Sequence, residues 1–499
     1  MPRHRKPTAA ERRNKEEMEP HRTLPSSTAT PSLTTPDYLF RSIDEVAKRL
    51  KPEAPVQCVF PEAVRTQAKR FIELFPGTVL YAVKCNPGAD ILRHMYAAGI
   101  RHFDVASLDE ARLVRGLFKD AKLHFMHPVK SREAIRRAYR MGIRDFSLDS
   151  AAELMKLMEE TKSARDLRLF IRLAVAGNAA AYDLSGKFGA APSVAADLLR
   201  HARKVAAKVG ICFHVGSQCM DPAAYTAAIG RALDVATKAK VKIDILDVGG
   251  GFPATYPNLI PPPLEAFMEA IKLAAQPLVE QGAELWCEPG RAMVAAGAAM
   301  LVRVTLRKGR RLYINDGTYG SLFDAGALGW RFPVRLVRPQ KGGKGNTHKH
   351  AGARPPSEKF VPFMFYGPTC DNLDKMKGPF LLPEDTQEGD WIEIGMLGAY
   401  GSTMQTRFNG FHSEVVATVW PEAAPFAFER PRRKSVMTPG QPEPAAQQVS
   451  AMRRAVAPRT MPKSTEQPQQ LSLIADEPQG APQNRHAPGH SQGPPLSAK

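Results

Sequence analysis

A lysine stands inside the run YAVKCNP, residues 81 to 87, whose other members have the apolar composition of a buried strand. A lysine in such a run usually brings its ammonium group to the surface and buries only its aliphatic stem. Lys84 can instead face a pocket, where desolvation lowers the pKa of the amine and makes it a nucleophile for Schiff-base chemistry. The residues that gather near Lys84 must decide between these two interpretations.

Two glycine-containing motifs could bind an anion. HVGS, residues 214 to 217, and DVGGGF, residues 247 to 252, each follow an apolar run. Three successive glycines let backbone N–H groups approach a phosphate closely, and the hydroxyl of Ser217 adds another donor. Each motif alone is more typical of a tight turn between a strand and a helix, whereas the two together at one site favour a phosphate cradle.

The tetrapeptide EPGR, residues 288 to 291, adds a carboxylate and a guanidinium. Arg291 can bind a phosphate through two parallel hydrogen bonds, and Glu288 can face a ring nitrogen, although the two could also simply pair at a turn. An amine, a phosphate cradle and a carboxylate are together what pyridoxal phosphate requires for its aldehyde, its phosphate and its protonated ring nitrogen. His214 would then stack on the ring, the alternative being a histidine of the core.

The chain around these motifs alternates strands and helices. Eight apolar or β-branched runs are separated by segments with apolar residues at helical spacing. The runs are 78–86, 101–107, 123–127, 145–150, 167–175, 211–217, 245–252 and 284–291. Eight such units predict an α/β fold, the (β/α)8 TIM barrel, because parallel strands covered by helices read as continuous apolar runs.

In a barrel of this kind, the chemistry lies at the C-terminal ends of the strands. The polar residues of the eight runs fall at these ends: Lys84, Asp104, Ser107, His127, Asp149, Arg172, His214, Ser217, Gly249, Gly250, Gly251, Glu288 and Arg291. Their shared position is a stronger indication than any single motif, because eight strands would not all end in this way by chance. We therefore expect Lys84 to face a pocket that binds pyridoxal phosphate.

Composition divides the rest of the chain. We expect a barrel over residues 61–291 and a mainly β domain over 292–420, which the segment 37–60 joins because the strand count starts only after it. Residues 1–36 and the Pro/Gln-rich residues 421–499 are predicted to be disordered tails. The basic stretch 338–359 is predicted to be a flexible loop inside the β domain.

The overall composition excludes several classes of protein. The chain has 499 residues and a formal charge of +19, but its basic residues are scattered and form no stripe for nucleic acid. Six cysteines without paired spacing predict reduced thiols in a cytoplasmic protein and no metal site. Since no apolar run could cross a bilayer, we expect neither a membrane span nor an exported protein.

An ordered set of motifs resembles a known family. These are YAVKCNP, FDVAS followed by Glu110, DLSGKFG, FHVGS, DVGGGFP, EPGR, YGPTCDNLD and MLGAY, all between about residues 40 and 420. They resemble the alanine racemase-like fold type of pyridoxal phosphate enzymes and, more narrowly, the ornithine/lysine decarboxylase family (group IV decarboxylases). The tails and the basic loop lie outside the resemblance.

The resemblance implies a role for each matching residue. Lys84 would form the Schiff base, Glu288 would contact the pyridine nitrogen and His214 would stack on the ring. Cys370 would act in catalysis and Asp371 would bind the distal ammonium of the substrate, both reaching the barrel of a second subunit in a homodimer. The other residues implied to contact the cofactor are Asp104, Glu110, Arg172, Ser217, Gly249, Gly250, Gly251, Gly290, Arg291 and Tyr400.

One segment departs from the family pattern. The Tyr-Asp pair that follows the NDGxYGS stretch in the family is replaced here by Phe323 and Asp324, on a shortened segment that continues as GALGW. Asp324 is expected to remain a second ammonium ligand, with Tyr319 and Phe323 beside the substrate. The lost hydroxyl leaves the preferred side-chain length open.

The expected activity is decarboxylation of L-ornithine to putrescine in polyamine biosynthesis. Lysine decarboxylation, alone or in addition, is the main alternative, because one methylene changes binding by only about 1–3 kcal/mol. A diaminopimelate decarboxylase is disfavoured because its CESGD-like motif is absent. The pair of Cys370 and Asp371 speaks against a racemase, and the presence of the lysine, the cysteine and the phosphate ligands speaks against a non-catalytic relative.

Overall fold

The computed structural model describes residues 39–175, 179–339 and 355–420. The predicted tails 1–36 and 421–499, and most of the predicted loop 338–359, lie outside the described residues. The chain divides into a unit of residues 1–429, to which every described element belongs, and a second unit of residues 430–499. None of the helices within the described ranges is long and apolar enough to cross a membrane.

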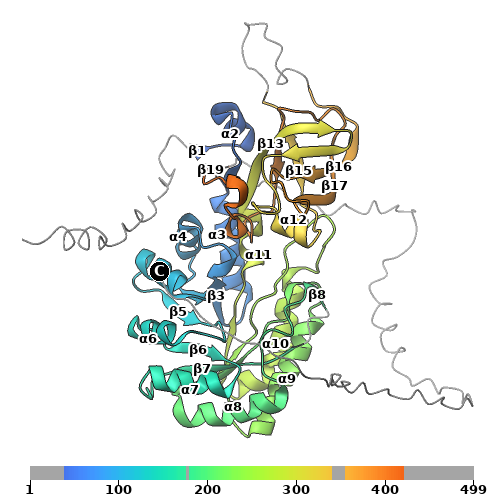
Figure 1. Cartoon of the computed structure of the whole chain (residues 1–499). Helices are drawn as coiled ribbons and strands as arrows, with labels where there is room; N and C mark the ends of the chain where they lie inside the picture. The colour runs from blue at the N-terminus through green and yellow to red at the C-terminus, as the bar shows by residue number, and fades with distance from the viewer. Residues whose placement is uncertain (1–38, 176–178, 340–354, 421–499) are drawn as a thin grey trace, which may run out of the picture. The chain divides into compact units, whose positions relative to one another are not determined.

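Eight parallel strands close into a barrel, which confirms the predicted fold class (Figure 1). Seven of the strands lie within a run read from the sequence or differ from it by one residue at the start, whereas β9 begins three residues before the run 211–217 and shares only Ile211 and Cys212 with it. The strands are β3 (Thr78–Ala82), β4 (His102–Val105), β5 (Lys122–Phe125), β6 (Asp145–Leu148), β7 (Arg168–Arg172), β9 (Lys208–Cys212), β11 (Ile245–Asp247) and β12 (Glu284–Cys287). The last strand pairs with the first, Cys287 opposite Val79, and so closes the barrel.

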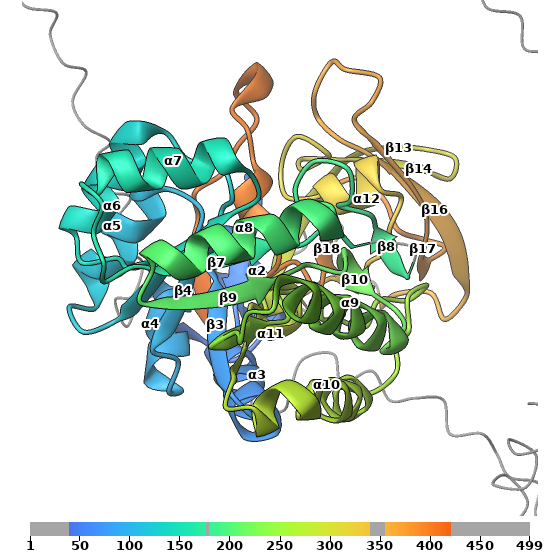
Figure 2. The same cartoon turned by 90° about the horizontal axis from the view of Figure 1, so that it is seen from below.

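Helices between the strands cover the outside of the barrel (Figure 2). They are α3 (Pro61–Leu74), α4 (Ala89–Ala97), α5 (Leu108–Leu117), α6 (Arg132–Arg140), α7 (Ala151–Glu160), α8 (Pro192–Val205), α9 (Ala223–Ala239) and α10 (Leu264–Glu280). Ser107, Ser131 and Ser150 begin α5, α6 and α7, each accepting a hydrogen bond from a backbone N–H of the first turn. These caps end the preceding loops and orient the strand ends.

Apolar side chains fill the barrel. Leu80, Met126, Phe170, Ile245 and Trp286 form a buried cluster inside it. A short antiparallel pair, β8 (Ala180–Tyr182) and β10 (Ser217–Cys219), follows β7 and β9. Because the interior is packed, a ligand can enter only from the ends of the strands.

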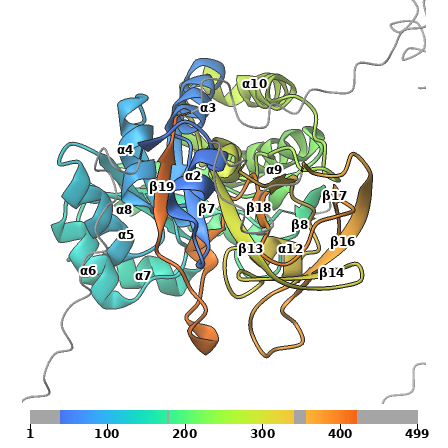
Figure 3. The same ribbon diagram turned by 90° about the horizontal axis from the view of Figure 1, so that it is seen from above.

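The second part is a mainly β domain whose nine-stranded sheet combines both ends of the described chain (Figure 3). Two strands, β1 (Leu39–Phe40) and β2 (Val56–Val59), precede the barrel, with α2 (Ile43–Leu50) between them. The others are β13 (Ala298–Lys308), β14 (Arg311–Ile314), β15 (Val334–Val337), β16 (Phe360–Tyr366), β17 (Lys375–Pro383), β18 (Trp391–Ile394) and β19 (Val416–Val419). In the sheet, β2 lies between β13 and β19, and β1 pairs with β19.

Short helical segments connect the β domain to the barrel mouth. They are η2 (Val83–Cys85), α11 (Arg291–Val294), η3 (Ala295–Gly297), α12 (Phe323–Ala327), η5 (Ser402–Met404) and η6 (Phe408–Gly410). The backbone N–H of Tyr400 donates to Cys85 O at 3.0 Å, and Asn86 Nδ2 donates to Gly398 O at 2.8 Å. The β domain therefore contributes directly to the region beside Lys84.

Arg338 differs from the predicted flexible loop. Its guanidinium is buried, with ion pairs to Asp385 at 2.7 Å and to Asp390 at 2.6 Å. A buried arginine between two carboxylates is an anchored residue. Residue 338, which directly follows β15 (Val334–Val337), is therefore held by two carboxylates, while the rest of the predicted loop stays a prediction.

Candidate active site

Lys84 lies in η2, directly after β3, at the C-terminal end of the barrel. Its Nζ is 3.2 Å from Asp104 Oδ2 at the end of β4, and 42% of its side chain is exposed. Asp104, reinforced by Glu288, raises the pKa of Lys84 and outweighs the opposing effect of burial. The expectation that desolvation lowers the pKa of this amine is therefore wrong, because a buried carboxylate stands beside it.

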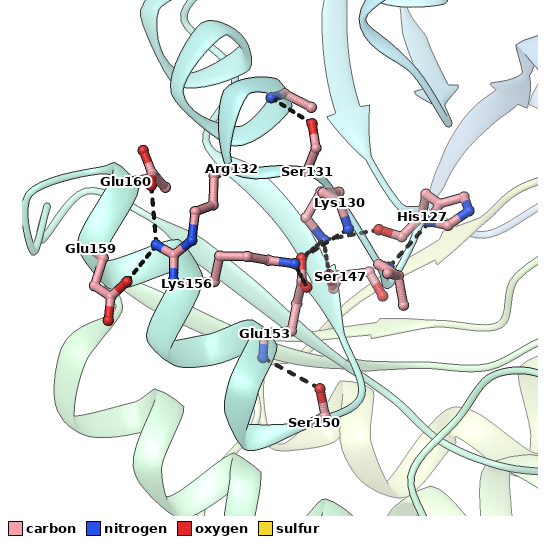
Figure 4. A network of polar contacts seen from close by, with 12 residues as sticks. His127, Lys130, Ser131, Arg132, Ser147, Ser150, Glu153, Lys156, Glu159 and Glu160 are labelled. Carbon is pink, nitrogen blue, oxygen red and sulfur yellow. Dashed lines mark hydrogen bonds and ion pairs between the residues drawn. The ribbon is translucent and has the colours of Figure 1, made fainter. Parts of the chain in front are cut away.

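A second lysine near the barrel mouth serves as a contrast (Figure 4). Lys130 Nζ donates to the carbonyl oxygens of His127 at 2.9 Å and Ser147 at 2.6 Å, and pairs with Glu153 at 3.1 Å. Its side chain is fully buried, and burial lowers its pKa to about 8. With all three donors used and no exposed surface, Lys130 joins the loop after β5 to α7, whereas Lys84 is accessible to a ligand.

A cavity with an empty volume of about 290 Å³ opens beside Lys84. Eight of the residues predicted for the cofactor site line it, together with Ala82 and Phe252. These eight are Lys84, His214, Ser217, Gly251, Glu288, Gly290, Arg291 and Tyr400. The sequence motifs from strands far apart in the chain thus meet at one place.

The glycine run forms one wall of the cavity. A Cβ on Gly250 would stand 2.6 Å from Glu288 O, and one on Gly251 would stand 2.4 Å from Gly216 O. Gly251 also has a φ of 105°, which other residues rarely adopt. Only glycine therefore allows the backbone to run this close to the strand ends, which keeps the wall open for a phosphate.

Two buried carboxyl groups lie under the cavity. Burial raises the pKa of Glu288 well above its usual range, and the nearby Asp247 and Asp104 raise it further. The pKa of Asp247 rises to about 6, again mainly through burial. Glu288 Oε1 is buried without a hydrogen-bond partner among the described residues. A buried acceptor of this kind is suited to a ligand that brings its own donor.

His214 contributes an uncharged ring to the wall. Its Nδ1 accepts a hydrogen bond from Gly216 N at 3.1 Å. Burial lowers the pKa of His214 well below its usual range, and the positive charges of Arg172 and Lys84 lower it further. The imidazole is therefore neutral at pH 7, with a face that can stack on a planar ligand.

Arg291 begins α11 at the cavity wall, where its guanidinium already has three partners. Nη1 donates to Asp324 Oδ2 at 2.8 Å and to the Tyr256 hydroxyl at 3.0 Å, while Nε donates to Ser217 Oγ at 3.4 Å. The carboxylate of Asp324 thus lies on the arginine that is predicted to bind a phosphate. Its predicted role as an ammonium ligand remains a prediction, which this placement does not favour.

Three aromatic rings surround Arg291, of which only Tyr400 is among the residues predicted for the cofactor site. Its Cζ is 4.5 Å from the centre of the Trp330 ring, 4.9 Å from that of Tyr400 and 5.9 Å from that of Tyr256. Trp330 belongs to the GALGW stretch, which was noted only as a departure from the family. No spacing in the sequence connects Tyr256 or Trp330 with the EPGR motif.

Several residues predicted for the cofactor site lie near the cavity without lining it. Glu110 accepts a hydrogen bond from Ala106 N at 2.7 Å and so supports the start of α5. Arg172 ends β7 and acts on His214 through its charge. Gly249 and Gly250 precede Gly251, the one glycine of this run that lines the cavity, and their roles toward the cofactor remain predictions.

Two residues predicted to contact the substrate, Tyr319 and Asp371, lie together on the β domain, apart from Asp324. The Tyr319 hydroxyl donates to Asp371 Oδ2, and Leu373 N donates to Asp371 Oδ1 at 3.0 Å. Cys370 is the exposed cysteine of the chain, the other five being buried. None of Tyr319, Cys370 and Asp371 lines the cavity of the same chain. Phe323, the first residue of α12, is half-buried.

Comparisons with known proteins identify the family. The model of the pyridoxal-binding domain of pyridoxal-dependent decarboxylases matches residues 62–295. A lysine/ornithine decarboxylase from Selenomonas ruminantium is 34% identical over 343 residues, which are 67% of this chain and 81% of that protein. The chain belongs to the pyridoxal-dependent decarboxylase family.

Two further comparisons place this decarboxylase among its relatives. The ornithine decarboxylase of Mus musculus is 30% identical over 415 residues, which are 76% of this chain and 83% of that protein. The crystal structure of the arginine decarboxylase of Paramecium bursaria Chlorella virus superposes with a TM-score of 0.65 at 26% identity, covering 75% of this chain and 100% of that one. These three decarboxylases thus differ in the amino acid for which they are named.

The cavity of this decarboxylase fits its cofactor, pyridoxal phosphate. The unpaired Glu288 Oε1 matches the need of a pyridine nitrogen for an acceptor, and the glycine wall leaves room where any Cβ would collide. Lys84 offers an accessible amine, and Ser217 and Arg291 offer donors for a phosphate. Each chemical group of the cofactor thus finds a complementary residue.

Asp374 positions the loop of this decarboxylase that carries Cys370 and Asp371. Its buried carboxylate accepts hydrogen bonds from Thr318 N at 2.7 Å, from Thr369 N at 3.0 Å and from Thr369 Oγ1 at 2.7 Å. Gly317 and Gly367 flank it so closely that a Cβ on either would stand 2.1 Å from Asp374 Oδ1. The Asp374 carboxylate therefore links two segments, the one that precedes Tyr319 and the one that precedes Cys370.

We expect Asp374→Ala to lower kcat/KM at least about tenfold, because losing three hydrogen bonds loosens the loop by roughly 2–3 kcal/mol. The visible absorbance of the bound cofactor should stay unchanged, since Lys84 lies on the barrel. Measurement of kcat/KM and of the cofactor absorbance in the same samples checks both expected results. Asp385→Ala, which removes another β-domain carboxylate that pairs with Arg338, is the control and should keep kcat/KM within threefold of the wild type. Equal losses in both variants would contradict a specific role for Asp374.

Proposed function

We propose that this decarboxylase converts L-ornithine to putrescine and CO2, with lysine to cadaverine as a second activity. Its family membership and relatives named for ornithine, lysine/ornithine and arginine support a basic amino acid as substrate. The observation that carries the proposal is the Asp371 carboxylate, held by Tyr319 next to Cys370 on a loop anchored by Asp374. A carboxylate at this place suits an amino acid whose side chain ends in a cation.

We assign a separate role in the reaction to each of several residues at the cavity. When bound, pyridoxal phosphate supplies an electron sink that lets the bond between Cα and the carboxylate break with loss of CO2. Asp104, 3.2 Å from Lys84 Nζ, raises the pKa of Lys84, so it stabilises the protonated amine and fixes its position beside the cavity. Glu288 would hold the ring nitrogen, and His214 would stack on the ring. Cys370 Sγ then donates a proton to Cα.

A homodimer with shared active sites accounts for the position of Cys370 and Asp371. Both lie outside the cavity of their own chain, so we propose that they reach the cavity of a second copy. Three apolar side chains near them in the fold or sequence are exposed to 67%, 46% and 44%: Leu373, Phe411 and Phe408. Such side chains are suited to burial in an interface.

The proposal is tested by incubating the purified protein and pyridoxal phosphate with ornithine, lysine, arginine or diaminopimelate, and by identifying the amine and the CO2 formed. Putrescine formed with the highest kcat/KM supports it. Agmatine as the main product, or a racemised amino acid without CO2, would replace it. A protein that binds pyridoxal phosphate and releases no CO2 from any of the four would be a non-catalytic relative.

We expect Asp371→Asn to raise the KM for ornithine and for lysine by roughly tenfold to a hundredfold, because a charge-assisted hydrogen bond contributes about 1.5–3 kcal/mol. The affinity for pyridoxal phosphate should not change. Steady-state kinetics with both substrates checks this against Asn372→Ala, a change at the neighbouring exposed position. An unchanged KM in Asp371→Asn would remove Asp371 from the substrate site.

A further inference from the structure

Asp324 lies on α12 of the β domain, yet its partner belongs to the barrel. Its carboxylate is 2.8 Å from Arg291 Nη1, and the two side chains are only 7% and 4% exposed. Burial raises the pKa of Asp324, while Arg291 lowers it. Arg291 lines the cavity, whereas Asp324 stands behind it and does not. The carboxylate is therefore placed to act on the arginine and not on a ligand in the cavity.

The hydrogen bonds of Arg291 divide its guanidinium into two edges. Among the described residues, its partners are bonded to Nη1 and Nε, and Nη1 has both Asp324 and Tyr256. The Trp330 ring lies 4.5 Å from Cζ and limits movement of the plane. With Nη1 held, Nη2 has no partner among the described residues, and Nε has the 3.4 Å contact with Ser217 Oγ, itself predicted to bind the phosphate. The edge formed by Nη2 and Nε can therefore bind a phosphate beside this hydroxyl.

We propose that Asp324 is a positioning residue for the cofactor phosphate: it holds Arg291 by Nη1 so that the other edge of the guanidinium faces the phosphate. The carboxylate therefore acts on cofactor affinity through Arg291 and makes no contact with the substrate ammonium. The inference rests on binding of pyridoxal phosphate by Arg291, and it holds whichever amino acid is the substrate.

The two roles considered for Asp324 predict different responses to the same substitutions. As a positioning residue it needs to accept a hydrogen bond from Nη1, which an asparagine oxygen at the same place also does. As a ligand of an ammonium group it needs its charge, so that asparagine would be nearly as harmful as alanine. Rescue by the amide thus separates the two roles.

The test measures equilibrium binding of pyridoxal phosphate, and of pyridoxal, which lacks the phosphate, to the full-length protein by absorbance. Asp324→Ala is expected to weaken binding of pyridoxal phosphate at least tenfold and to change that of pyridoxal less than twofold. Asp324→Asn should stay within threefold of the wild type for both. With saturating pyridoxal phosphate, the KM for the amino acid substrate should stay within twofold in both variants.

A control and a second variant separate the proposal from a loss of stability. Asp390→Ala breaks another buried ion pair of the β domain, with Arg338, and should leave cofactor binding unchanged. Tyr256→Phe removes the other partner of Nη1 and should weaken binding of pyridoxal phosphate about threefold. This variant tests the proposal if Asp324→Ala does not fold. Equal weakening for pyridoxal and its phosphate, or a raised substrate KM with unchanged cofactor affinity in Asp324→Asn, would overturn the proposal. If the wild-type protein decarboxylates no amino acid, its substrate KM cannot be measured. The measurements of cofactor binding would still test the proposal.

Discussion

Lys84→Ala is expected to lower kcat by roughly 10⁴-fold or more, the scale expected when a group that reacts covalently is removed. The second lysine near the barrel mouth, Lys130, cannot replace it, because its side chain is fully buried and its ammonium group is bonded to three partners. The variant should also lose the visible absorbance that arises when the cofactor is bound to a lysine. Release of CO2 and the absorbance spectrum, both measured with added pyridoxal phosphate, check these two results.

Lys84→Arg is the matched control for this prediction. Arginine keeps a positive charge beside Asp104 and so preserves the ion pair, but it cannot react as an amine. If Lys84 acted only through its charge, Lys84→Arg would restore most of the activity. We expect it to be as inactive as Lys84→Ala, and normal turnover in either variant would refute the proposed role of this lysine.

Cys370→Ala is expected to lower kcat by about 10²–10³-fold, because a positioned acid contributes on this scale. Cys370 is the exposed cysteine of the chain, so iodoacetamide should inactivate the wild-type protein in proportion to one label per chain. The variant should take up no label without unfolding. Mass spectrometry of the labelled peptide, together with kcat, checks both statements. Inactivation that follows labelling of a buried cysteine would contradict them.

Mixing the two inactive variants tests the shared site. Dissociation and random reassociation of Lys84→Ala and Cys370→Ala subunits would place both intact residues at one site of each mixed dimer. Because half of the dimers are then mixed, roughly a quarter of the wild-type activity should return. If mass measurements show that mixed dimers form and these dimers are inactive, Cys370 and Lys84 of the same chain act at one site, and the shared site is refuted.

The barrel and most of its cavity could be predicted because their signals are local. Strands buried on both faces leave apolar runs, and the residue after each run must lie at the barrel mouth. Lys84, His214 and Glu288 were found in this way. Their motifs are also specific enough to resemble one family of enzymes.

The electrostatics and the surroundings of Arg291 could not be predicted because they depend on distances between remote segments. The pKa of Lys84 is raised and not lowered because Asp104, 20 residues away in sequence, stands 3.2 Å from Nζ. The resemblance to the family implies that Asp324 binds the substrate, whereas its carboxylate accepts a hydrogen bond from Arg291, 33 residues earlier in the sequence. No pattern of spacing reports such a contact.

The position of β2 in the sheet has a consequence for the synthesis of the protein. This strand of four residues, with the sequence VQCV, pairs with β13 on one side and β19 on the other. The ribosome must add residues 60–415 before β19 begins, which takes on the order of half a minute. The barrel can be completed during this time, while an apolar strand at its N-terminal end waits with one edge unpaired. The growing chain is therefore open to aggregation until β19 is made, and a chaperone that covers β2 should raise the yield of folded protein.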